Sequence, residues 1–320
     1  MARATPPPAP HPRNAAMHAS TSTKPAKLKH ALGSFHIPVG NIHCHLIADG
    51  TAPYPLAQAF AANADPDEAA NLLKDHFLPT HGHGPLAVNA LLINAPNATI
   101  LIDAGCGNDS PQGVGLLQTH LDQLNIKPNH IDAALITHLH SDHTGGFLSP
   151  EPIQSLHNTP ILITHDEHDF WSNNPDIPNP TTPAQTKQRL IDTAQQTIDS
   201  LKPRLEPVPA NHRLADGVTL VPMPGHTPGH VGVQIESEGQ LLLFITDLIH
   251  VPALQLQRTD WYAAFDTDPK LAIETKRRLL ERIAADRLTI AGTHLPFPAT
   301  VHLHKTGNHA YAFQPAFWTF

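Results

Sequence analysis

The sequence contains few cysteines and few basic residues, and each scarcity excludes a class of protein. Its 320 residues include only two cysteines, Cys44 and Cys106, which cannot build the disulfide framework of a small secreted domain. Lysine and arginine number 20 against 28 acidic residues, and this net charge of −8 argues against a nucleic-acid-binding protein. No apolar run approaches the roughly 20 residues that span a bilayer. We therefore expect a cytoplasmic protein that engages neither nucleic acid nor a membrane.

Two regions of the chain differ in composition. Residues 1–33 are rich in proline and alanine and nearly lack large apolar side chains, so they cannot offset the entropy cost of ordering. They also lack the apolar stretch and cleavage site of a secretory signal. Short apolar runs recur over residues 34–320, and 40% of the chain is hydrophobic, enough for a sizeable core. The composition predicts a flexible tail over 1–33 and one folded domain over 34–320.

Short strands alternate with amphipathic helices in the folded region, and some strands form hairpins. The clearest helix covers residues 270–285, because Asp268 fits its N-cap and Pro269 its first position. This alternation predicts an α/β architecture in which helices cover sheets. We expect a turn at 48–50 and further helices at 115–124 and 186–201. We expect strands at 37–47, 86–93, 99–102, 131–137, 161–164, 218–221, 231–236, 241–246 and 288–291.

Histidine is unusually frequent, with 25 residues against 20 lysines and arginines together. Histidine is the commonest metal ligand, and residues 136–143, Ile-Thr-His-Leu-His-Ser-Asp-His, concentrate ligand-type side chains after a predicted strand. His138 and His140 lie two residues apart, so an extended backbone points both the same way. Together with Asp142 and His143 they crowd a single tetrahedral ion, but they can divide between two neighbouring ions.

Three more ligand-type residues occupy the same kind of position. Each of His226, Asp247 and His294 comes soon after a predicted strand. Loops at one end of a sheet are where α/β folds gather the residues of their sites. This shared placement predicts that the three residues converge with the segment 136–143 on one metal centre.

The ordered set of ligand residues resembles the metallo-β-lactamase superfamily of binuclear hydrolases over nearly all of residues 35–310. Within it, the chain resembles the methyl parathion hydrolase type and the related quorum-quenching lactonases. The superfamily motifs are matched by Asp103, by His138, His140, Asp142 and His143, and by His226, Asp247 and His294. The finer resemblance is carried by Asp49-Gly50-Thr51, Asp169-Phe170-Trp171, Thr246-Asp247-Leu248-Ile249 and His294-Leu295-Pro296-Phe297-Pro298.

This resemblance implies a four-layer αβ/βα sandwich, the metallo-β-lactamase fold, with its site at one edge. It implies two divalent metal ions, zinc in the first place and manganese, cobalt or iron as alternatives. Asp247 would bridge the ions, and Asp103 would orient the histidine loop from behind. One ion would take His138, His140 and His226, and the other Asp142, His143 and His294.

The same resemblance implies a metallo-hydrolase that uses a metal-bridging hydroxide to cleave small esters. The expected substrates are lactones, including acyl-homoserine lactones, and organophosphate triesters, and family analogy implies a homodimer. Asp142, Asp247 and His250 are the expected catalytic residues, with Asp142 accepting a proton. His250 stands where acyl-homoserine lactonases often carry a tyrosine, three residues after Asp247, so it either donates a hydrogen bond to the substrate or packs as a loop residue.

Three further residues are candidates for the substrate pocket. Phe170 and Trp171 match an aromatic position that lines the leaving-group pocket in the organophosphate branch, and packing in the core or a lid is the alternative. His302 is expected at the edge of the substrate. These assignments complete the predicted site.

Other functions stay open at this point. A glyoxalase II-like thioesterase or another hydrolase would share the fold, although no basic cluster for glutathione is evident near the C-terminus. A non-catalytic histidine-rich metal-binding protein would explain the 25 histidines but not the ligand residues at strand ends. Such a protein would hold many ions weakly, whereas the hydrolase would hold about two tightly.

Overall fold

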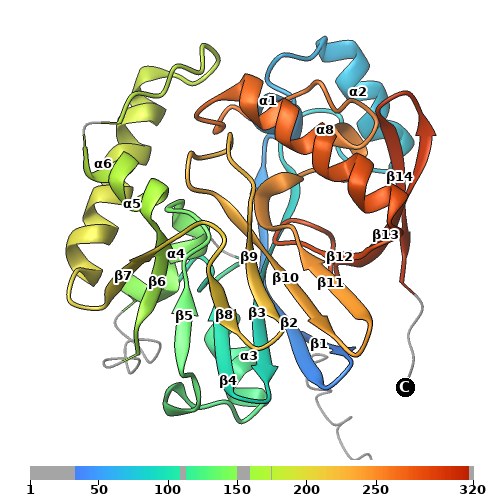
Figure 1. Cartoon of the computed structure of the whole chain (residues 1–320). Helices are drawn as coiled ribbons and strands as arrows, with labels where there is room; N and C mark the ends of the chain where they lie inside the picture. The colour runs from blue at the N-terminus through green and yellow to red at the C-terminus, as the bar shows by residue number, and fades with distance from the viewer. Residues whose placement is uncertain (1–32, 109–112, 150–158, 174, 317–320) are drawn as a thin grey trace, which may run out of the picture. The chain divides into compact units, whose positions relative to one another are not determined.

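A computed structural model describes residues 33–108, 113–149, 159–173 and 175–316 of the chain. The tail predicted over 1–33 lies outside these residues except for Gly33. The described residues all fall within one compact unit. In this unit two seven-stranded sheets face each other with helices outside them (Figure 1), which confirms the expected four-layer αβ/βα sandwich.

The N-terminal half of the chain forms the first sheet. Along the sheet, the first three pairs of neighbouring strands are antiparallel and the last three pairs are parallel. Parallel strands end at the same edge of a sheet, so the loops after them lie close together. In spatial order the strands are β1 (Ser34–Val39), β2 (Ile42–Tyr54), β3 (Gly84–Ala95), β4 (Ala98–Ile102), β5 (Ala133–Leu135), β6 (Ile161–Thr164) and β7 (Leu205–Val208).

The C-terminal half forms the second sheet. Strands β11 and β12 are its parallel pair, and the other neighbours are antiparallel. The loops after β11 and β12 therefore leave the same edge side by side. In spatial order the strands are β14 (Ala310–Pro315), β13 (Thr300–Gly307), β12 (Thr289–Ala291), β11 (Gln240–Phe244), β10 (Val231–Ser237), β9 (Val218–Pro222) and β8 (Arg213–Ala215).

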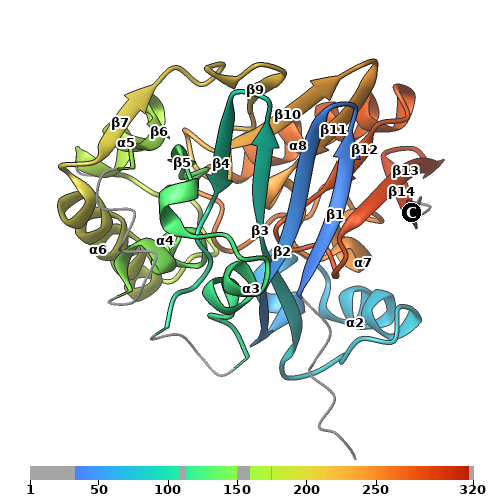
Figure 2. The same ribbon diagram turned by 90° about the horizontal axis from the view of Figure 1, so that it is seen from below.

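Helices cover the outer faces of both sheets, as the view from below also shows (Figure 2). The first sheet is covered by α3 (Leu117–Gln123), α4 (Ser141–Leu148), α5 (His165–Ser172) and α6 (Ala184–Leu201). The second is covered by α8 (Pro269–Ala285), and α1 (Leu56–Phe60), α2 (Pro66–Asp75) and α7 (Pro252–Gln255) form a separate apolar cluster. Single turns of 3-10 helix lie at Pro128–His130 and Thr246–Leu248. Among the described residues, none of these helices has the length and apolar character needed to cross a membrane.

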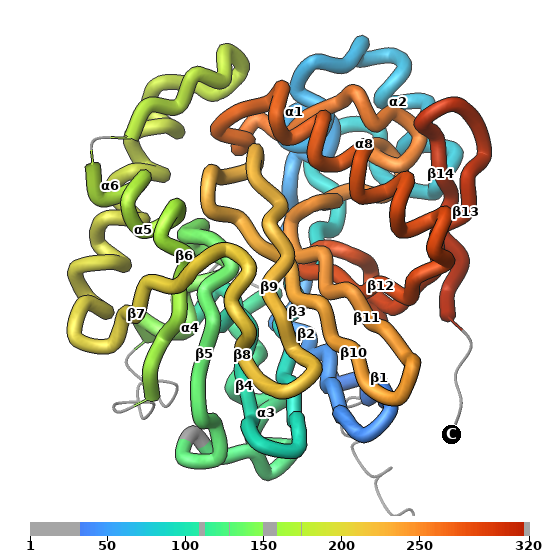
Figure 3. The backbone as a smooth tube through the Cα atoms, in the orientation of Figure 1, coloured from blue at the N-terminus to red at the C-terminus, as the bar shows by residue number. Residues whose placement is uncertain are grey.

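The core between the sheets is built from alternate strand residues. In β10, for example, Val231, Val233 and Ile235 are buried in the cluster that joins the two sheets. Alternate residues of a strand share a face, so one face of each strand supplies the core. The chain path of Figure 3 shows how the second half of the sequence returns to lie against the first.

Most predicted elements are present, and the region before residue 54 differs. The single strand expected at 37–47 is a hairpin, because the chain reverses at Gly40, whose φ of 56° is the left-handed conformation that glycine adopts readily. The turn expected at 48–50 lies within β2 as a bulge between Ala48 and Gly50. Asp49 is buried there and accepts hydrogen bonds from three backbone N–H groups, so it cannot belong to a surface turn. The helix at 270–285 is confirmed, with Asp268 capping it.

Candidate metal centre

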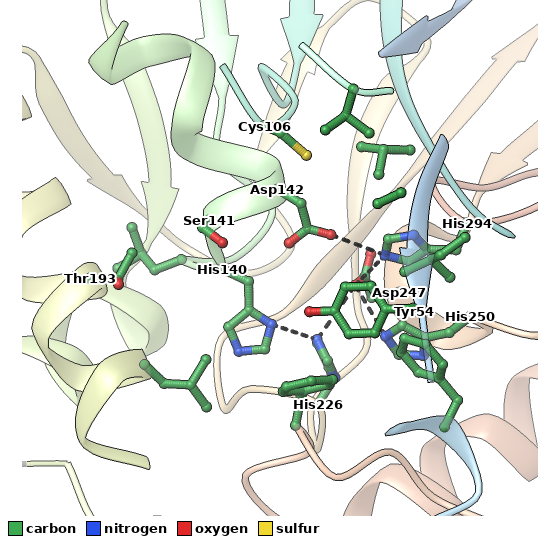
Figure 4. Close-up of a pocket in the computed structure, with 18 of the residues that line it drawn as sticks. Tyr54, Cys106, His140, Ser141, Asp142, Thr193, His226, Asp247, His250 and His294 are labelled. Atoms are coloured by element: carbon green, nitrogen blue, oxygen red, sulfur yellow. Dashed lines mark hydrogen bonds and ion pairs between the residues drawn. The ribbon is translucent and has the colours of Figure 1, made fainter. Parts of the chain in front are cut away.

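Loops that follow strands of both sheets bring the seven predicted ligand residues together at one edge of the sandwich. The segment 138–143 follows β5, Asp247 follows β11, and His294 follows β12, whereas His226 lies between β9 and β10. Figure 4 shows the labelled members pointing toward one another from these loops. Ligand-type atoms of the described residues form four overlapping groups of three, each with members within 4.8 Å of one another, and one of these groups joins His250 to His226 and Asp247. The structure therefore brings all seven residues into one cluster of side chains.

The first group consists of His138, His140 and His226. All three imidazoles are buried, and His140 Nδ1 lies 3.0 Å from His226 Nε2. The rings of His138 and His140 meet edge to face, with centroids 4.6 Å apart. Three imidazole nitrogens facing one space form a donor set that suits zinc and other borderline metal ions.

The second group consists of Asp142, His143 and His294. His294 Nε2 lies 3.5 Å and His143 Nε2 lies 3.8 Å from Asp142 Oδ2. His143 and His294 are buried, whereas the Asp142 side chain is 28% exposed. Two nitrogens and a carboxylate oxygen thus face a second space, with one member open to solvent.

Asp247 lies between the two groups and contacts both. Its Oδ1 is 3.1 Å from His143 Nε2, and its Oδ2 is 3.0 Å from His294 Nε2 and 3.5 Å from His226 Nε2. Both oxygens belong to a side chain that is 2% exposed. A single buried carboxylate that faces two sets of imidazoles has the position needed to bridge two cations.

Several buried polar atoms at this centre make no hydrogen bond within the described part of the chain. They are Nε2 of His138, Nε2 of His143 and Oδ1 of Asp247, and the last two lie 3.1 Å apart without the alignment of a hydrogen bond. Buried polar atoms are nearly always paired, because an unpaired one costs free energy. Imidazole nitrogens and carboxylate oxygens are ligands of divalent zinc. The residues therefore fit the pair of divalent cations that the sequence implies.

Asp103 orients the histidine loop from behind, in the place the sequence predicts. Its carboxylate accepts hydrogen bonds from His143 Nδ1 at 2.7 Å, from Thr137 N at 2.9 Å and from the Thr137 hydroxyl at 2.8 Å. Because Nδ1 of His143 donates, its Nε2 is left to face the centre. Asp103 adopts a left-handed backbone with φ of 60°, a conformation that aspartate tolerates better than most residues.

His230 supports the loop that carries Asp247. Its Nδ1 donates to the Met223 carbonyl at 2.9 Å, and its Nε2 lies 2.6 Å from the Thr246 hydroxyl. Thr246 has φ of 44°, which is strained for a β-branched residue. These contacts hold the strained turn that aims Asp247 at both groups.

Two buried acids that the sequence analysis did not identify also contact the ligand loops. Asp266 accepts from His226 Nδ1 at 2.7 Å, which leaves Nε2 of His226 to face the centre. Glu167 accepts the backbone N–H of Leu139, between the first two histidines, at 2.9 Å. Neither acid belongs to a recognisable local motif, so no signal in the sequence distinguished them.

Burial and neighbouring charges determine the protonation of the metal-free centre. Burial, aided by neighbouring histidines, lowers the pKa of His138 and His140 well below the ordinary value. Burial also acts on His143, but the carboxylates of Asp247, Asp103 and Asp142 outweigh it and hold its pKa well above the ordinary value. For Asp247 the surrounding histidines outweigh burial, so its pKa lies well below the usual range. Asp247 is therefore ionised, as a bridging ligand must be.

We expect acid to destabilise the metal-free protein through its buried neutral histidines. Burial lowers the pKa of His230 to about 3 and that of His250 to about 4, against an ordinary 6.5. Below pH 6.5 the unfolded chain binds protons that the folded chain refuses, so each histidine removes about 1.4 kcal/mol of unfolding free energy per pH unit. The stability that depends on keeping these two histidines neutral is therefore fully present above pH 6.5 and is lost as the pH falls toward 4. The raised pKa of His143 affects the unfolding free energy only above pH 6.5, where it makes that free energy fall as the pH rises.

Urea unfolding of the chelator-treated protein between pH 7 and pH 5 measures this slope. His250→Phe is the matched variant, because phenylalanine can retain the stacking on Phe60 and His294 but cannot titrate. In the variant we expect the slope of unfolding free energy against pH to correspond to about one proton fewer taken up on unfolding. An identical slope in both proteins would contradict the assignment.

A cavity of about 280 Å³ opens beside the metal centre. At one end its wall consists of His140, Asp142, His226, Asp247, His250 and His294. Apolar side chains line much of the rest, including Ala52, Leu86, Val88, Phe60 and Phe265, and Tyr54 reaches in from β2 (Figure 4). Pockets of this kind, apolar with a few polar groups at one end, are typical of small-molecule sites.

Of the four other predicted site residues, His250 lines the cavity, and the other three lie outside its lining. His250 lines the cavity, with Nε2 at 3.2 Å from Asp247 Oδ2. Trp171 and Phe170 do not line it, because α5 packs on the outer face of the first sheet, where Trp171 is fully buried and donates to Glu167. His302 lies on β13 and contacts the Leu288 carbonyl, away from the cavity lining. Trp171 and Phe170 therefore pack in the core, which is the alternative given for them, and His302 lies outside the cavity lining where a substrate contact was expected.

Curated relatives match about half of the chain. An N-acyl homoserine lactonase of Bacillus cereus is 25% identical over 169 residues, which are 53% of this chain and 58% of that protein. A probable metallo-hydrolase of Bacillus subtilis, YflN, is 24% identical over 156 residues, or 48% of this chain and 56% of its own length. The chain thus spans little more than half the length of the curated relatives it matches.

Solved structures match nearly the whole chain. AidC, a dizinc quorum-quenching lactonase solved with the product N-hexanoyl-L-homoserine, is 26% identical with a TM-score of 0.82, covering 90% of this chain and 99% of its own. The hydrolase AbOPH shares the fold at 24% identity with a TM-score of 0.81, covering 91% and 100% of the two chains. The family model of the metallo-beta-lactamase superfamily matches residues 83–294, which include all seven predicted ligand residues. The chain belongs to the metallo-β-lactamase superfamily.

Proposed function

We propose that this protein is a binuclear metal-dependent hydrolase of small esters, with lactones, including acyl-homoserine lactones, as its substrates. The observation that carries the proposal is the meeting of two groups of ligand residues around the Asp247 carboxylate at the polar end of a cavity with apolar walls. The relatives and structural neighbours include lactonases by name, which supports the substrate class.

The residues would hold two divalent ions, for which zinc is our first assignment. One ion would be held by His138, His140 and His226, and the other by Asp142, His143 and His294, with Asp247 between them. When bound, such ions supply Lewis acidity, which lowers the pKa of water and polarises an ester oxygen. No serine or cysteine nucleophile is needed at such a centre.

The chain's own side chains supply proton handling and orientation. Asp142 lines the cavity with a partly exposed carboxylate, which suits it to take up a proton during hydrolysis. His250 is held by stacking on Phe60 and His294 and keeps its Nδ1 unpaired among the described residues. Burial lowers its pKa to about 4, so at neutral pH it is an uncharged imidazole beside the substrate. We assign it the role of a polar contact to the substrate's ester group.

The cavity wall favours an apolar tail on the substrate. The set that lines the space includes Leu86 and Val88 of β3, Ala52 of β2 and the aromatic rings of Phe60 and Phe265. Burial of apolar surface contributes about 25 cal/mol per Å², so an acyl chain would add binding energy there. Organophosphate triesters stay a prediction from the short sequence stretches, because the same Lewis acidity serves phosphoryl centres.

Removal of the metal is expected to abolish hydrolysis, and zinc is expected to restore it. The assay compares acyl-homoserine lactones of increasing chain length, simple lactones, aryl esters, a phosphotriester and S-lactoylglutathione, before and after chelation. We expect kcat/KM to be highest for lactones and to rise with acyl length. Preference for S-lactoylglutathione would favour the thioesterase, and hydrolysis that survives complete chelation would contradict the proposal. Many weakly held ions without turnover would instead indicate a storage protein.

A further inference from the structure

Glu167 is a fully buried acid on α5 whose two oxygens have four hydrogen-bond donors. Oε1 accepts from Leu139 N at 2.9 Å and from Trp171 Nε1 at 2.7 Å. Oε2 accepts from the Thr227 hydroxyl at 2.5 Å and from Gly229 N at 3.1 Å. A carboxylate has about four acceptor positions, so these contacts satisfy it. The buried charge is thus fully matched by groups from three separate segments.

Each oxygen of Glu167 holds one of the loops that carry the first group of ligands. Leu139 lies between His138 and His140, and Thr227 directly follows His226. The two loops come from different sheets, and 28 and 60 residues separate Glu167 from Leu139 and Thr227. One carboxylate therefore joins the backbone of the His138–His140 segment to the loop of His226.

The close approach of α5 to the His226 loop reinforces this link. A Cβ on Gly229 would lie 2.1 Å from Glu167 N, so only glycine allows the loop to lie this close. Thr164, which caps α5 by accepting from Glu167 N, donates its hydroxyl to the Gly229 carbonyl at 2.8 Å. The start of α5 is therefore fixed against the loop by contacts on both sides of Gly229.

We propose that Glu167 is a positioning residue for the metal centre, which sets the separation of His138 and His140 from His226 and thereby the affinity for the ion between them. It touches neither metal nor substrate and acts through the two backbones it joins. Partners behind the ligands commonly change metal affinity by about 10–100-fold when removed. The inference rests on the proposed function only in requiring that two ions bind.

Glu167→Gln tests the proposal because glutamine keeps the shape but has one acceptor oxygen. Its amide can serve either Leu139 N or Gly229 N, and the other N–H then faces an NH₂ donor. Trp171→Phe is the matched control, because it removes one bond to the same Oε1 but keeps an aromatic ring beside His140 and leaves the bonds from Glu167 to Leu139, Thr227 and Gly229 in place. The two variants separate a loss of stability from a loss of ligand positioning.

Stepwise affinities for zinc, measured by competition with a chromophoric chelator, provide the main readout. In Glu167→Gln we expect one of the two affinities to fall about 10–100-fold and the other to change little. Amide hydrogen exchange of the metal-free variant should show lost protection at Leu139 or Gly229. Trp171→Phe should lower the melting temperature while keeping both affinities.

Two unchanged affinities in Glu167→Gln would overturn the proposal, and so would an equal fall of both that matches Trp171→Phe. Wild-type protein that binds fewer than two ions would overturn it as well. If Glu167→Gln does not fold, Thr227→Val removes the single hydroxyl bond and is expected to weaken the same ion by a smaller factor. Absence of lactone hydrolysis with both ions bound would refute the proposed substrate alone and leave this inference standing.

Discussion

Replacing Asp247 with asparagine is expected to lower lactone hydrolysis by about 1,000-fold. The Asp247 carboxylate contacts both ligand groups, with Oδ1 3.1 Å from His143 Nε2 and Oδ2 3.0 Å from His294 Nε2. Asparagine retains the shape but loses the negative charge and one of the two acceptor oxygens. The charge that balances two neighbouring cations is then missing, so we also expect one tightly held ion per chain instead of two.

Steady-state kinetics and the metal content of the purified variant check this expectation together. The control is Asp75→Asn, at an exposed position at the end of α2, which should leave both quantities unchanged. Because Asp247 is buried, the unfolding of the metal-free variant must also be measured, so that a folding defect is not read as a catalytic one. A folded Asp247→Asn protein with wild-type turnover would refute the bridging role.

The candidate ligand residues stand out in the sequence because their signals are local. The spacing within residues 138–143 is visible without knowledge of the fold. So is the position of Asp247 and of His294 after an apolar run. Glu167 and Asp266 could not be predicted, because their partners lie far away in the sequence. Asp266, for example, is 40 residues from His226, and only the packing of the loops brings the two together.

The substrate cavity was the least predictable part of the site. Its apolar wall comes from β2 and β3, whose side chains show in the sequence only as buried strand residues. Trp171 shows the converse error, since an aromatic residue near a site motif can face either the cavity or the core. Trp171 belongs to α5, and its indole is buried in the core and donates to Glu167 of the same helix, an orientation that the resemblance to the organophosphate branch could not reveal.

The hairpin at the start of the domain was missed for a related reason. Residues 37–47 are continuously compatible with a strand, and Gly40-Asn41 is the only local sign of a reversal. The reversal places β1 at the edge of the first sheet and leaves β2 to continue through the bulge to Tyr54 at the cavity. The two-residue turn at Gly40-Asn41 therefore sets where β2 begins, and β2 carries Tyr54 to the cavity.

Asp103→Asn is expected to lower the affinity for the ion at Asp142, His143 and His294 by about 10–100-fold. In the wild type, Asp103 accepts from His143 Nδ1 at 2.7 Å and from the backbone and hydroxyl of Thr137. The asparagine amide has one acceptor oxygen, so at least one buried donor loses its partner, which costs about 1–3 kcal/mol of unfolding free energy. His143 is then no longer fixed with Nε2 toward the centre.

Comparison with Asp103→Ala separates the charge of this residue from its backbone conformation. Asparagine adopts the left-handed φ of 60° readily, whereas alanine pays roughly 1–2 kcal/mol for it. We therefore expect alanine to lower the unfolding free energy of the metal-free protein further than asparagine, while both weaken the same ion to a similar degree. Chelator competition and urea unfolding measure the two effects separately. Wild-type affinity for both ions in a folded Asp103→Asn protein would show that His143 is oriented by its packing alone, and that the aspartate serves only the turn.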